Sequence, residues 1–227
     1  LYHADRLGYM VWGEYPNWGF DLNRFDIEPF MINWREAMER DFNHPSLVGW
    51  CPFNETWGTD HNQKAIASVS AVYKMTKDLD PSRPVIDTSG FIHTSESDIF
   101  DVHDYEQNVE KFASHYEKLS EGIVKDVNYA DGYKGGPMFV SEYGGIGLKS
   151  DSGWSYGEAP EDAPALIRRY DGLTTYLLDN PDIFAFCYTQ LYDIEQEING
   201  LYTYDRVPKM DISKIRAINE KTAAIEK

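Results

Sequence analysis

The run Leu47–Phe53 constrains the fold more than any other part of the chain, because apolar side chains occupy both of its alternating sets of positions. A strand with two apolar faces is typical of a parallel sheet that other elements cover on both sides. Pro45 ends the helical pattern before this run, since the residue preceding a proline is disfavoured in the helical conformation. We therefore predict a buried parallel strand here.

Helix-like and strand-like patterns alternate along the chain, with no internal repeat or low-complexity tract. This alternation predicts an α/β fold built on a parallel sheet. Strands are predicted within residues 9–12, 47–53, 83–87, 99–105, 138–142 and 183–188. Helices are predicted within residues 1–8, 26–42, 64–79, 106–119, 164–178 and 212–227. The chain has 227 residues, 42% of them hydrophobic, and can therefore bury one substantial core.

Two of the predicted strands end in a glutamate. The pair Asn54-Glu55 follows the first apolar run, and Glu142 closes the strand at 138–142. Polar groups at the carboxyl ends of parallel strands face the cleft in which such folds bind their substrates. A single glutamate at a strand end is usually an ordinary carboxylate, but two in similar settings favour a catalytic site.

Short motifs surround both glutamates. Residues 43–46 are Asn-His-Pro-Ser, ahead of the strand and Asn54-Glu55, and residues 141–144 are Ser-Glu-Tyr-Gly. These motifs resemble the acid/base and nucleophile strands of glycoside hydrolase family 2, the group that holds β-galactosidases, β-glucuronidases and β-mannosidases. The resemblance implies a (β/α)₈ TIM barrel in which the two motifs close the fourth and seventh strands.

Two further segments carry the same resemblance. Leu-Gly-Tyr-Met-Val-Trp-Gly-Glu at 7–14 is similar to the third barrel strand, and residues 188–206 are similar to the segment after strand eight in one branch of the family. The resemblance implies that residues 1–227 are a partial barrel corresponding to strands three to eight, without strands one and two and the upstream β-sandwich domains. Better-known members place a tryptophan near Tyr188, so the resemblance leaves the sugar open.

The implied chemistry is that of a retaining exo-β-glycosidase, which hydrolyses terminal β-glycosides by double displacement. Glu142 is expected to attack the anomeric carbon, and Glu55 to protonate the leaving oxygen and later to deprotonate water. Formation of the glycosyl-enzyme removes the charge of Glu142, which lowers the pKa of Glu55 and lets it act first as acid and then as base. A β-galactoside is the expected substrate, with a β-glucuronide or a β-mannoside as alternatives.

Further residues are expected to bind the sugar. Asn54 would hydrogen-bond the 2-hydroxyl, a contact that strengthens as charge develops at the anomeric carbon. His103 and Tyr105 are two apart on a predicted strand and so point to one side, where Tyr105 would donate to Glu142 and His103 would bind a hydroxyl. Asn54 and His103 also have ordinary structural interpretations, as a loop amide and a strand-end histidine. Aromatic faces for sugar C–H groups are expected from Trp57, Trp154 and Tyr188.

Composition and missing motifs argue against other functions. The net charge of −17 and the pI near 4.6 would repel nucleic acid and an anionic membrane surface, but not a neutral carbohydrate. No phosphate-binding glycine loop, GxSxG elbow or HExxH motif occurs. No cofactor is expected. The cluster of potential metal ligands is Asp98, Asp101, His103 and Asp104. No metal site is expected there, because neighbouring residues on a strand point to opposite faces and cannot converge on one ion.

Two other interpretations stay open. A related retaining glycosidase of the β-mannanase or endoglucanase type also ends its strands in Asn-Glu and Glu. A partial barrel could instead be a non-catalytic carbohydrate-binding fragment. The Asn-His-Pro-Ser motif and the segment 190–206 favour family 2.

The sequence also predicts exposed strand edges and the state of its two cysteines. An open barrel leaves edges within 9–12 and 183–188, which should be paired or covered, and a homo-oligomer would cover them. Cys51 and Cys187 lie in apolar runs and are expected to be reduced, buried thiols.

Overall fold

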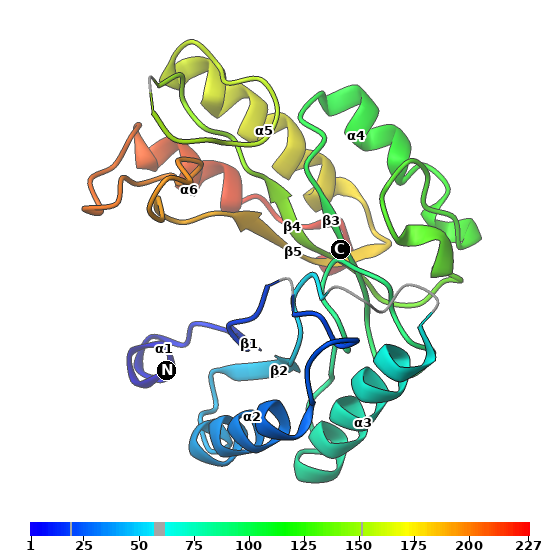
Figure 1. Ribbon diagram of the computed structural model, residues 1–227. Coiled ribbons are helices and arrows are strands. Elements are labelled where there is room, and N and C mark those ends of the chain that lie inside the picture. The colour runs from blue at the N-terminus through cyan, green and yellow to red at the C-terminus, as the bar shows by residue number, and fades with distance from the viewer. Residues whose placement is uncertain (19, 57–61, 151) are drawn as a thin grey trace. The chain divides into compact units, whose positions relative to one another are not determined.

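The computed structural model describes residues 1–18, 20–56, 62–150 and 152–227. Its contacts divide the chain into two units, Leu1–Asp101 and Val102–Lys227, and each unit contains a pair of parallel strands (Figure 1). Among the described residues, no helix combines the length and the apolar character needed to cross a lipid bilayer.

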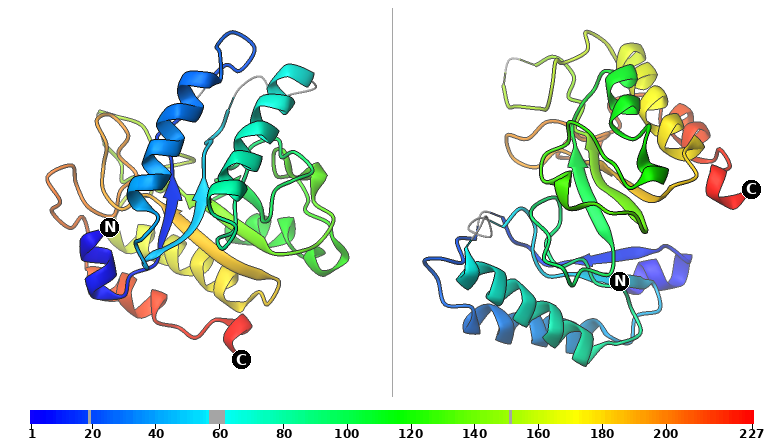
Figure 2. Two further views of the ribbon diagram at one scale, coloured as in Figure 1. Left: turned by 90° about the horizontal axis from the view of Figure 1, so that it is seen from below. Right: turned by 90° about the vertical axis from the view of Figure 1, so that its right-hand side faces the viewer.

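The first unit is a parallel strand pair with helices packed on it. Its elements are α1 (Tyr2–Leu7), β1 (Val11–Glu14), α2 (Glu28–Asp41), β2 (Leu47–Cys51) and α3 (Gln63–Leu79). The register of the pair runs from Val11 opposite Leu47 to Glu14 opposite Cys51. Figure 2 shows α2 and α3 side by side on one face of this pair.

These helices bury an aromatic core against β2. Trp34 and Met38, one helical turn apart on α2, are 2% and 1% exposed. The Trp34 indole packs edge-on against Trp50 of β2, with ring centroids 5.6 Å apart, and its Nε1 donates to Thr76 Oγ1 of α3 at 2.8 Å. A buried indole needs such an acceptor for its N–H. Trp34 therefore joins α2, α3 and β2 at one point.

The strand predicted at residues 83–87 is not formed, which corrects the expected total of six strands: the described residues form five. Two isolated parallel bridges lie beside β2 instead, the second of them between Asn54 and Ser89. Pro52 lies between the bridges and has no backbone N–H to donate. The ladder is therefore interrupted before a regular strand can form.

The second unit is a sheet in the order β3-β4-β5, in which β4 and β5 run parallel. Its strands and α-helices are β3 (Phe100–Asp104, whose first two residues belong to the first unit), α4 (Val109–His115), β4 (Met138–Gly144), α5 (Ala163–Asp179), β5 (Ile183–Thr189) and α6 (Ile212–Asn219). Short 3₁₀ turns occupy Leu119–Glu121, Ala130–Gly132 and Ala224–Glu226. Figure 2 shows α4, α5 and α6 over the same face of the sheet.

Two predicted helices are shorter than expected. The helix predicted at 106–119 begins only after Asn108, whose side chain caps the first turn of α4. The helix predicted at 212–227 ends at Asn219, and a separate turn follows because Glu226 Oε2 accepts from Ala223 N at 3.0 Å. Local side-chain contacts therefore set both helix boundaries.

The two cysteines differ in burial. Cys51 lies in β2 and is buried, as predicted, whereas Cys187 in β5 is exposed, which corrects the prediction. β5 is the last strand in the β3-β4-β5 order and has a neighbour on one side in the described part of the chain. An apolar pattern alone does not show that a strand lies at such an edge.

Candidate active site

The acid/base candidate Glu55 lies just beyond the carboxyl end of β2. Its backbone N–H donates to Ser89 O at 3.0 Å, and Ser89 N donates to Phe53 O at 2.8 Å. Glu55 has φ of 40°, in the left-handed region that residues other than glycine rarely adopt. Such a conformation persists where neighbouring contacts hold it. The paired backbone hydrogen bonds with Ser89 hold Glu55 in this conformation.

The side chains of Asn54 and Glu55 are half-buried. Trp18, in the segment between β1 and α2, donates from Nε1 to Glu55 Oε2 at 3.0 Å. Asn54 Oδ1 is buried and has no hydrogen-bond partner among the described residues. A buried acceptor left unpaired is destabilising by about 1–3 kcal/mol. This oxygen therefore keeps an unused capacity to accept a hydrogen bond.

The nucleophile candidate Glu142 is a half-buried residue in the otherwise buried strand β4. Tyr105, which directly follows β3, donates its hydroxyl hydrogen to Glu142 Oε2. His103 Nε2 lies 3.6 Å from Glu142 Oε1. The two-residue spacing of His103 and Tyr105 thus brings both side chains to one carboxylate.

Tyr105 is held as a hydrogen-bond donor. Its burial, reinforced by the negative charge of Glu142, raises the pKa of Tyr105 far above its ordinary value of 10. The hydroxyl therefore stays protonated at every pH at which a folded enzyme works. A donor fixed on a carboxylate favours the ionised form of that carboxylate.

The loop between β4 and α5 adds a residue to which the sequence analysis assigned no role. Tyr156 stacks face to face on Tyr105, with ring centroids 3.5 Å apart and planes inclined by 1°. The Tyr156 N–H donates to Gly145 O at 3.0 Å. The sequence signal was weak, because Tyr156 lies in a glycine- and serine-rich loop without periodicity.

Gln107 ties this loop to the end of β4. Its Nε2 donates to Gly144 O and to Tyr156 O, each at 2.7 Å, and its Oε1 accepts from Arg169 Nη1 at 2.6 Å. These contacts use both amide hydrogens and the amide oxygen. Gln107 therefore holds β4, the loop and α5 together around the stacked ring of Tyr105.

The three predicted aromatic residues differ in placement. Trp154 is 42% exposed, and its ring lies edge-on to Tyr156 with centroids 5.4 Å apart. The hydroxyl of Tyr188, on β5, accepts from Ile146 N at 3.2 Å, so Tyr188 anchors the loop that follows β4. Trp57 lies outside the described residues. Trp154 thus presents an open aromatic face beside the stacked tyrosines.

Cavities flank Tyr105 in the second unit. One of about 660 Å³ is lined by His103, Tyr105 and Lys111 among others, and another of about 640 Å³ lies between Tyr105 and Arg169. Their volumes are large enough for a monosaccharide or its leaving group.

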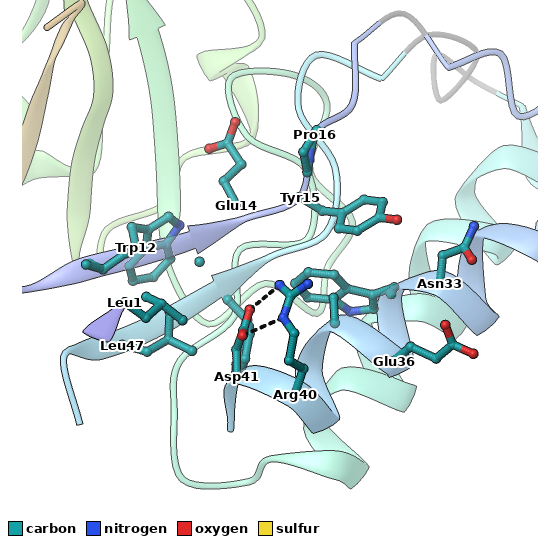
Figure 3. Close-up of a pocket in the computed structure, with 15 residues that line it drawn as sticks. Leu1, Trp12, Glu14, Tyr15, Pro16, Asn33, Glu36, Arg40, Asp41 and Leu47 are labelled. Atoms are coloured by element: carbon teal, nitrogen blue, oxygen red, sulfur yellow. Dashed lines mark hydrogen bonds and ion pairs between the residues drawn. The ribbon is translucent and has the colours of Figure 1, made fainter. Parts of the chain in front are cut away.

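A third cavity, of about 620 Å³, lies in the first unit between β1 and α2 (Figure 3). Trp12 and Glu14 border it, and Arg40 pairs with Asp41 through hydrogen bonds of 2.6 and 2.7 Å (Figure 3). Neither residue of the pair 54–55 is among the described residues that line it. This cavity is therefore separate from the acid/base candidate.

Two glutamates, one beyond the end of a parallel strand and one near the end of another, are candidates for the pair of carboxylates that glycosidases use. The family model described as "Glycosyl hydrolases family 2, TIM barrel domain" matches residues 26–174, more than half of the chain. The chain belongs to this family of glycoside hydrolases and represents part of its barrel.

Curated relatives carry the names of two activities. The chain is 30% identical over 168 residues to β-glucuronidase of Homo sapiens, a match that covers 62% of this chain and 26% of the human protein. It is 32% identical over 105 residues to β-galactosidase of Photobacterium profundum, a match that covers 44% of this chain and 9% of that protein. The chain thus spans about a quarter or less of the length of these relatives.

Solved structures share the fold. A GH2 β-galacturonidase from Eisenbergiella tayi matches with a TM-score of 0.75 at 16% identity, over 95% of this chain and 41% of the other. A β-glucuronidase from Faecalibacterium prausnitzii matches with a TM-score of 0.73 at 20% identity, over 98% and 41%.

Proposed function

We propose that the chain carries the catalytic carboxylates of a retaining exo-β-glycosidase, with Glu142 as nucleophile and Glu55 as acid/base. The hydrogen bond from the Tyr105 hydroxyl to Glu142 carries this proposal. A carboxylate with a permanent donor on one oxygen is oriented and kept ionised, which attack on an anomeric carbon requires.

The proposed reaction has two steps. In the first, an oxygen of Glu142 bonds to the anomeric carbon while the bond to the leaving oxygen breaks, and Glu55 gives that oxygen its proton. In the second, Glu55 removes a proton from water, whose oxygen displaces Glu142 from the anomeric carbon. Each step inverts the configuration, so the product keeps the β configuration of the substrate.

Substrate contacts are proposed from the residues around the two carboxylates. Asn54 Oδ1, which is buried without a partner among the described residues, would accept a hydrogen bond from the 2-hydroxyl. His103 and Tyr105 border the cavity of about 660 Å³ and would contact the sugar there. The aromatic residues Trp57, Trp154 and Tyr188 are proposed to face its C–H groups.

We infer a neutral sugar, with a β-galactoside first, a β-mannoside second and a β-glucuronide third. The cavity beside His103 is lined by the carboxylates of Asp104, Glu106 and Asp126, by the ammonium of Lys111 and by the imidazole of His115, which pairs with Asp104, so carboxylates outnumber the ammonium groups. A uronate would bring a further negative charge to this surface, and the whole chain already carries a net charge of −17. A neutral sugar meets no such repulsion.

Labelling with a 2-fluoro glycoside tests the proposal in the protein as its gene encodes it. A panel of aryl β-glycosides first identifies the sugar, and the matching 2-fluoro sugar with a good leaving group should then form a covalent adduct on Glu142. Peptide mass spectrometry locates the adduct, and Glu142→Gln is the control that should stay unlabelled. An adduct on another residue would refute the role of Glu142.

Azide rescue tests the acid/base role. Glu55→Ala should lose activity on substrates with poor leaving groups, and azide should restore turnover of activated substrates and yield a β-glycosyl azide. An α-glycosyl azide would refute the assignment. Turnover of β-mannan or cellulose in place of aryl glycosides would favour the endo-acting alternative, and sugar binding without any adduct would favour the non-catalytic one.

A further inference from the structure

The first unit contains a buried charged cluster in addition to the candidate catalytic residues. His93 Nδ1 lies 2.6 Å from Asp87 Oδ1, and His93 Nε2 lies 2.9 Å from Asp101 O and 3.1 Å from Asp101 Oδ1. The side chain of His93 is 4% exposed, and those of the two aspartates are fully buried. The two carboxylates are thus shielded from solvent, and the ring nearly so.

Both nitrogens of the His93 ring face oxygen acceptors, carboxylate on one side and carbonyl and carboxylate on the other. A neutral imidazole has one N–H and would set a lone pair against one of these oxygens, whereas an imidazolium donates from both nitrogens. Burial disfavours the charged ring, but the charge of Asp87 and the hydrogen bonds to Asp101 and Asp87 outweigh it and hold the pKa of His93 well above its usual range. The ring is therefore the cation that two buried carboxylates need.

One of these carboxylates is connected to the acid/base candidate. Asp101 Oδ2 accepts from Ser89 Oγ at 2.9 Å and from Gly90 N at 3.0 Å. Ser89 in turn accepts from Glu55 N at 3.0 Å through its backbone oxygen and donates from its N–H to Phe53 O at 2.8 Å. A continuous series of hydrogen bonds thus runs from the His93 ring through Asp101 and Ser89 to the backbone of Glu55.

Asp87, the other carboxylate, binds the backbone of the loop that carries His93. Asp87 Oδ1 accepts from Thr88 N at 2.8 Å, and Asp87 Oδ2 accepts from Thr94 N at 2.5 Å. The segment 87–94 is therefore folded around His93 by its own backbone. This folded segment carries Ser89. It fixes the position of Ser89 in place of a regular strand, because only isolated bridges form beside β2 in this segment.

We propose that His93, held between Asp87 and Asp101, is a positioning residue that sets the place of Glu55 through Asp101 and Ser89. This inference rests on the acid/base role proposed for Glu55. His93 acts on the position of the general acid and takes no part in bond making. Its loss should therefore matter most when the leaving group needs a proton from Glu55.

The test compares two substrates in the protein as its gene encodes it. An aryl β-glycoside with a poor leaving group, such as phenyl, needs protonation in the first step, and a dinitrophenyl glycoside does not. His93→Gln should lower kcat/KM for the phenyl glycoside by about 100-fold, the loss typical of a misplaced catalytic group. The dinitrophenyl glycoside should lose much less, so the ratio of the two values should change.

Two further variants make the test decisive. Ser89→Ala leaves the ion cluster intact and removes one hydrogen bond on the way to Glu55, so it should change the ratio in the same direction by about fivefold. His44→Gln is the matched control, because His44 pairs with Asp5 at 2.6 Å in the same unit, away from the series of hydrogen bonds that ends at Glu55. It should leave the ratio unchanged.

The outcomes separate this inference from the proposed function. Equal losses on both substrates in folded His93→Gln, with an unchanged ratio in Ser89→Ala, would overturn the positioning role. If His93→Gln does not fold, Ser89→Ala alone decides. An unchanged ratio in Glu55→Ala would instead refute the acid/base role, and the inference about His93 would fall with it.

Discussion

The two candidate catalytic glutamates are held in different ways. Glu142 lies within the regular strand β4, and Tyr105 and His103 contact its carboxylate. Glu55 lies beyond the end of its strand with φ of 40°, and Ser89 holds it through backbone hydrogen bonds. Both carboxylates have a hydrogen-bond donor, the Tyr105 hydroxyl for Glu142 and the Trp18 indole for Glu55, but Glu142 lies within a regular strand and Glu55 depends on backbone hydrogen bonds beyond the end of one.

The difference fits the task proposed for each residue. A nucleophile has to be ionised when it attacks, so donors that favour the carboxylate assist it. An acid/base residue has to gain and lose a proton in every cycle, and strong donors on its carboxylate would oppose the protonated state. Backbone hydrogen bonds set the position of Glu55, and the donor that the structure gives its carboxylate is the neutral indole N–H of Trp18.

The largest effect should come from replacing each glutamate by glutamine. Glu142→Gln should abolish turnover of every glycoside, because no bond to the anomeric carbon can form. Glu55→Gln should lower kcat/KM by about 10²- to 10⁴-fold for poor leaving groups and far less for dinitrophenyl glycosides. Steady-state kinetics on both substrates measure the contrast, and the opposite pattern would exchange the two roles.

Tyr105→Phe should have the next largest effect. It removes a charge-assisted hydrogen bond worth about 1.5–3 kcal/mol, so kcat/KM should fall by about 10- to 100-fold. Without the donor the ionised form of Glu142 is less favoured, and the acidic limb of the pH–rate profile should move to higher pH.

A second tyrosine provides the control for this variant. Tyr176 donates its hydroxyl to Ala113 O at 3.0 Å, between α5 and α4. Tyr176→Phe should leave both kcat/KM and the pH–rate profile unchanged. An acidic limb that stays in place in Tyr105→Phe would show that the two glutamates do not differ as we suggest.

Gly144→Ala should have a smaller effect, on stability. Gly144 has φ of 86°, and an added Cβ would lie 2.3 Å from Tyr188 Cε2. The left-handed backbone alone costs roughly 1–2 kcal/mol in the free energy of unfolding for alanine, and the clash adds to it. Gly135→Ala is the control, since Gly135 has φ of 92° with no atom within 4 Å of the added Cβ. Equal losses in urea unfolding would show that the end of β4 is not rigid.

The smallest effect concerns a buried histidine of the second unit. A hydrogen bond to Asp104 raises the pKa of His115 above its ordinary value of 6.5. A raised pKa stabilises the fold below pH 6.5, and this stabilisation is lost as the pH rises through the folded value. Urea midpoints should therefore fall as the pH rises above 6.5, and His115→Gln should remove part of this fall. A slope that the substitution leaves unchanged would contradict the assignment.

Much of the fold could be predicted from neighbouring residues. The apolar run before Asn54-Glu55 and the short strand before Glu142 predict where β2 and β4 form, because a strand pattern depends on residues two apart. The same rule places His103 and Tyr105 on one side of their strand. Family motifs around the two glutamates then indicate the glycoside hydrolase class, which the comparisons confirm.

Contacts between distant residues decided the rest. The stack of Tyr156 on Tyr105, the amide of Gln107 shared with Arg169 and the backbone hydrogen bond from Glu55 to Ser89 all join residues more than thirty positions apart. No local period encodes such contacts, because they depend on how complete elements pack. For the same reason the exposure of Cys187 and the replacement of a strand by bridges beside Pro52 emerged only from the tertiary structure.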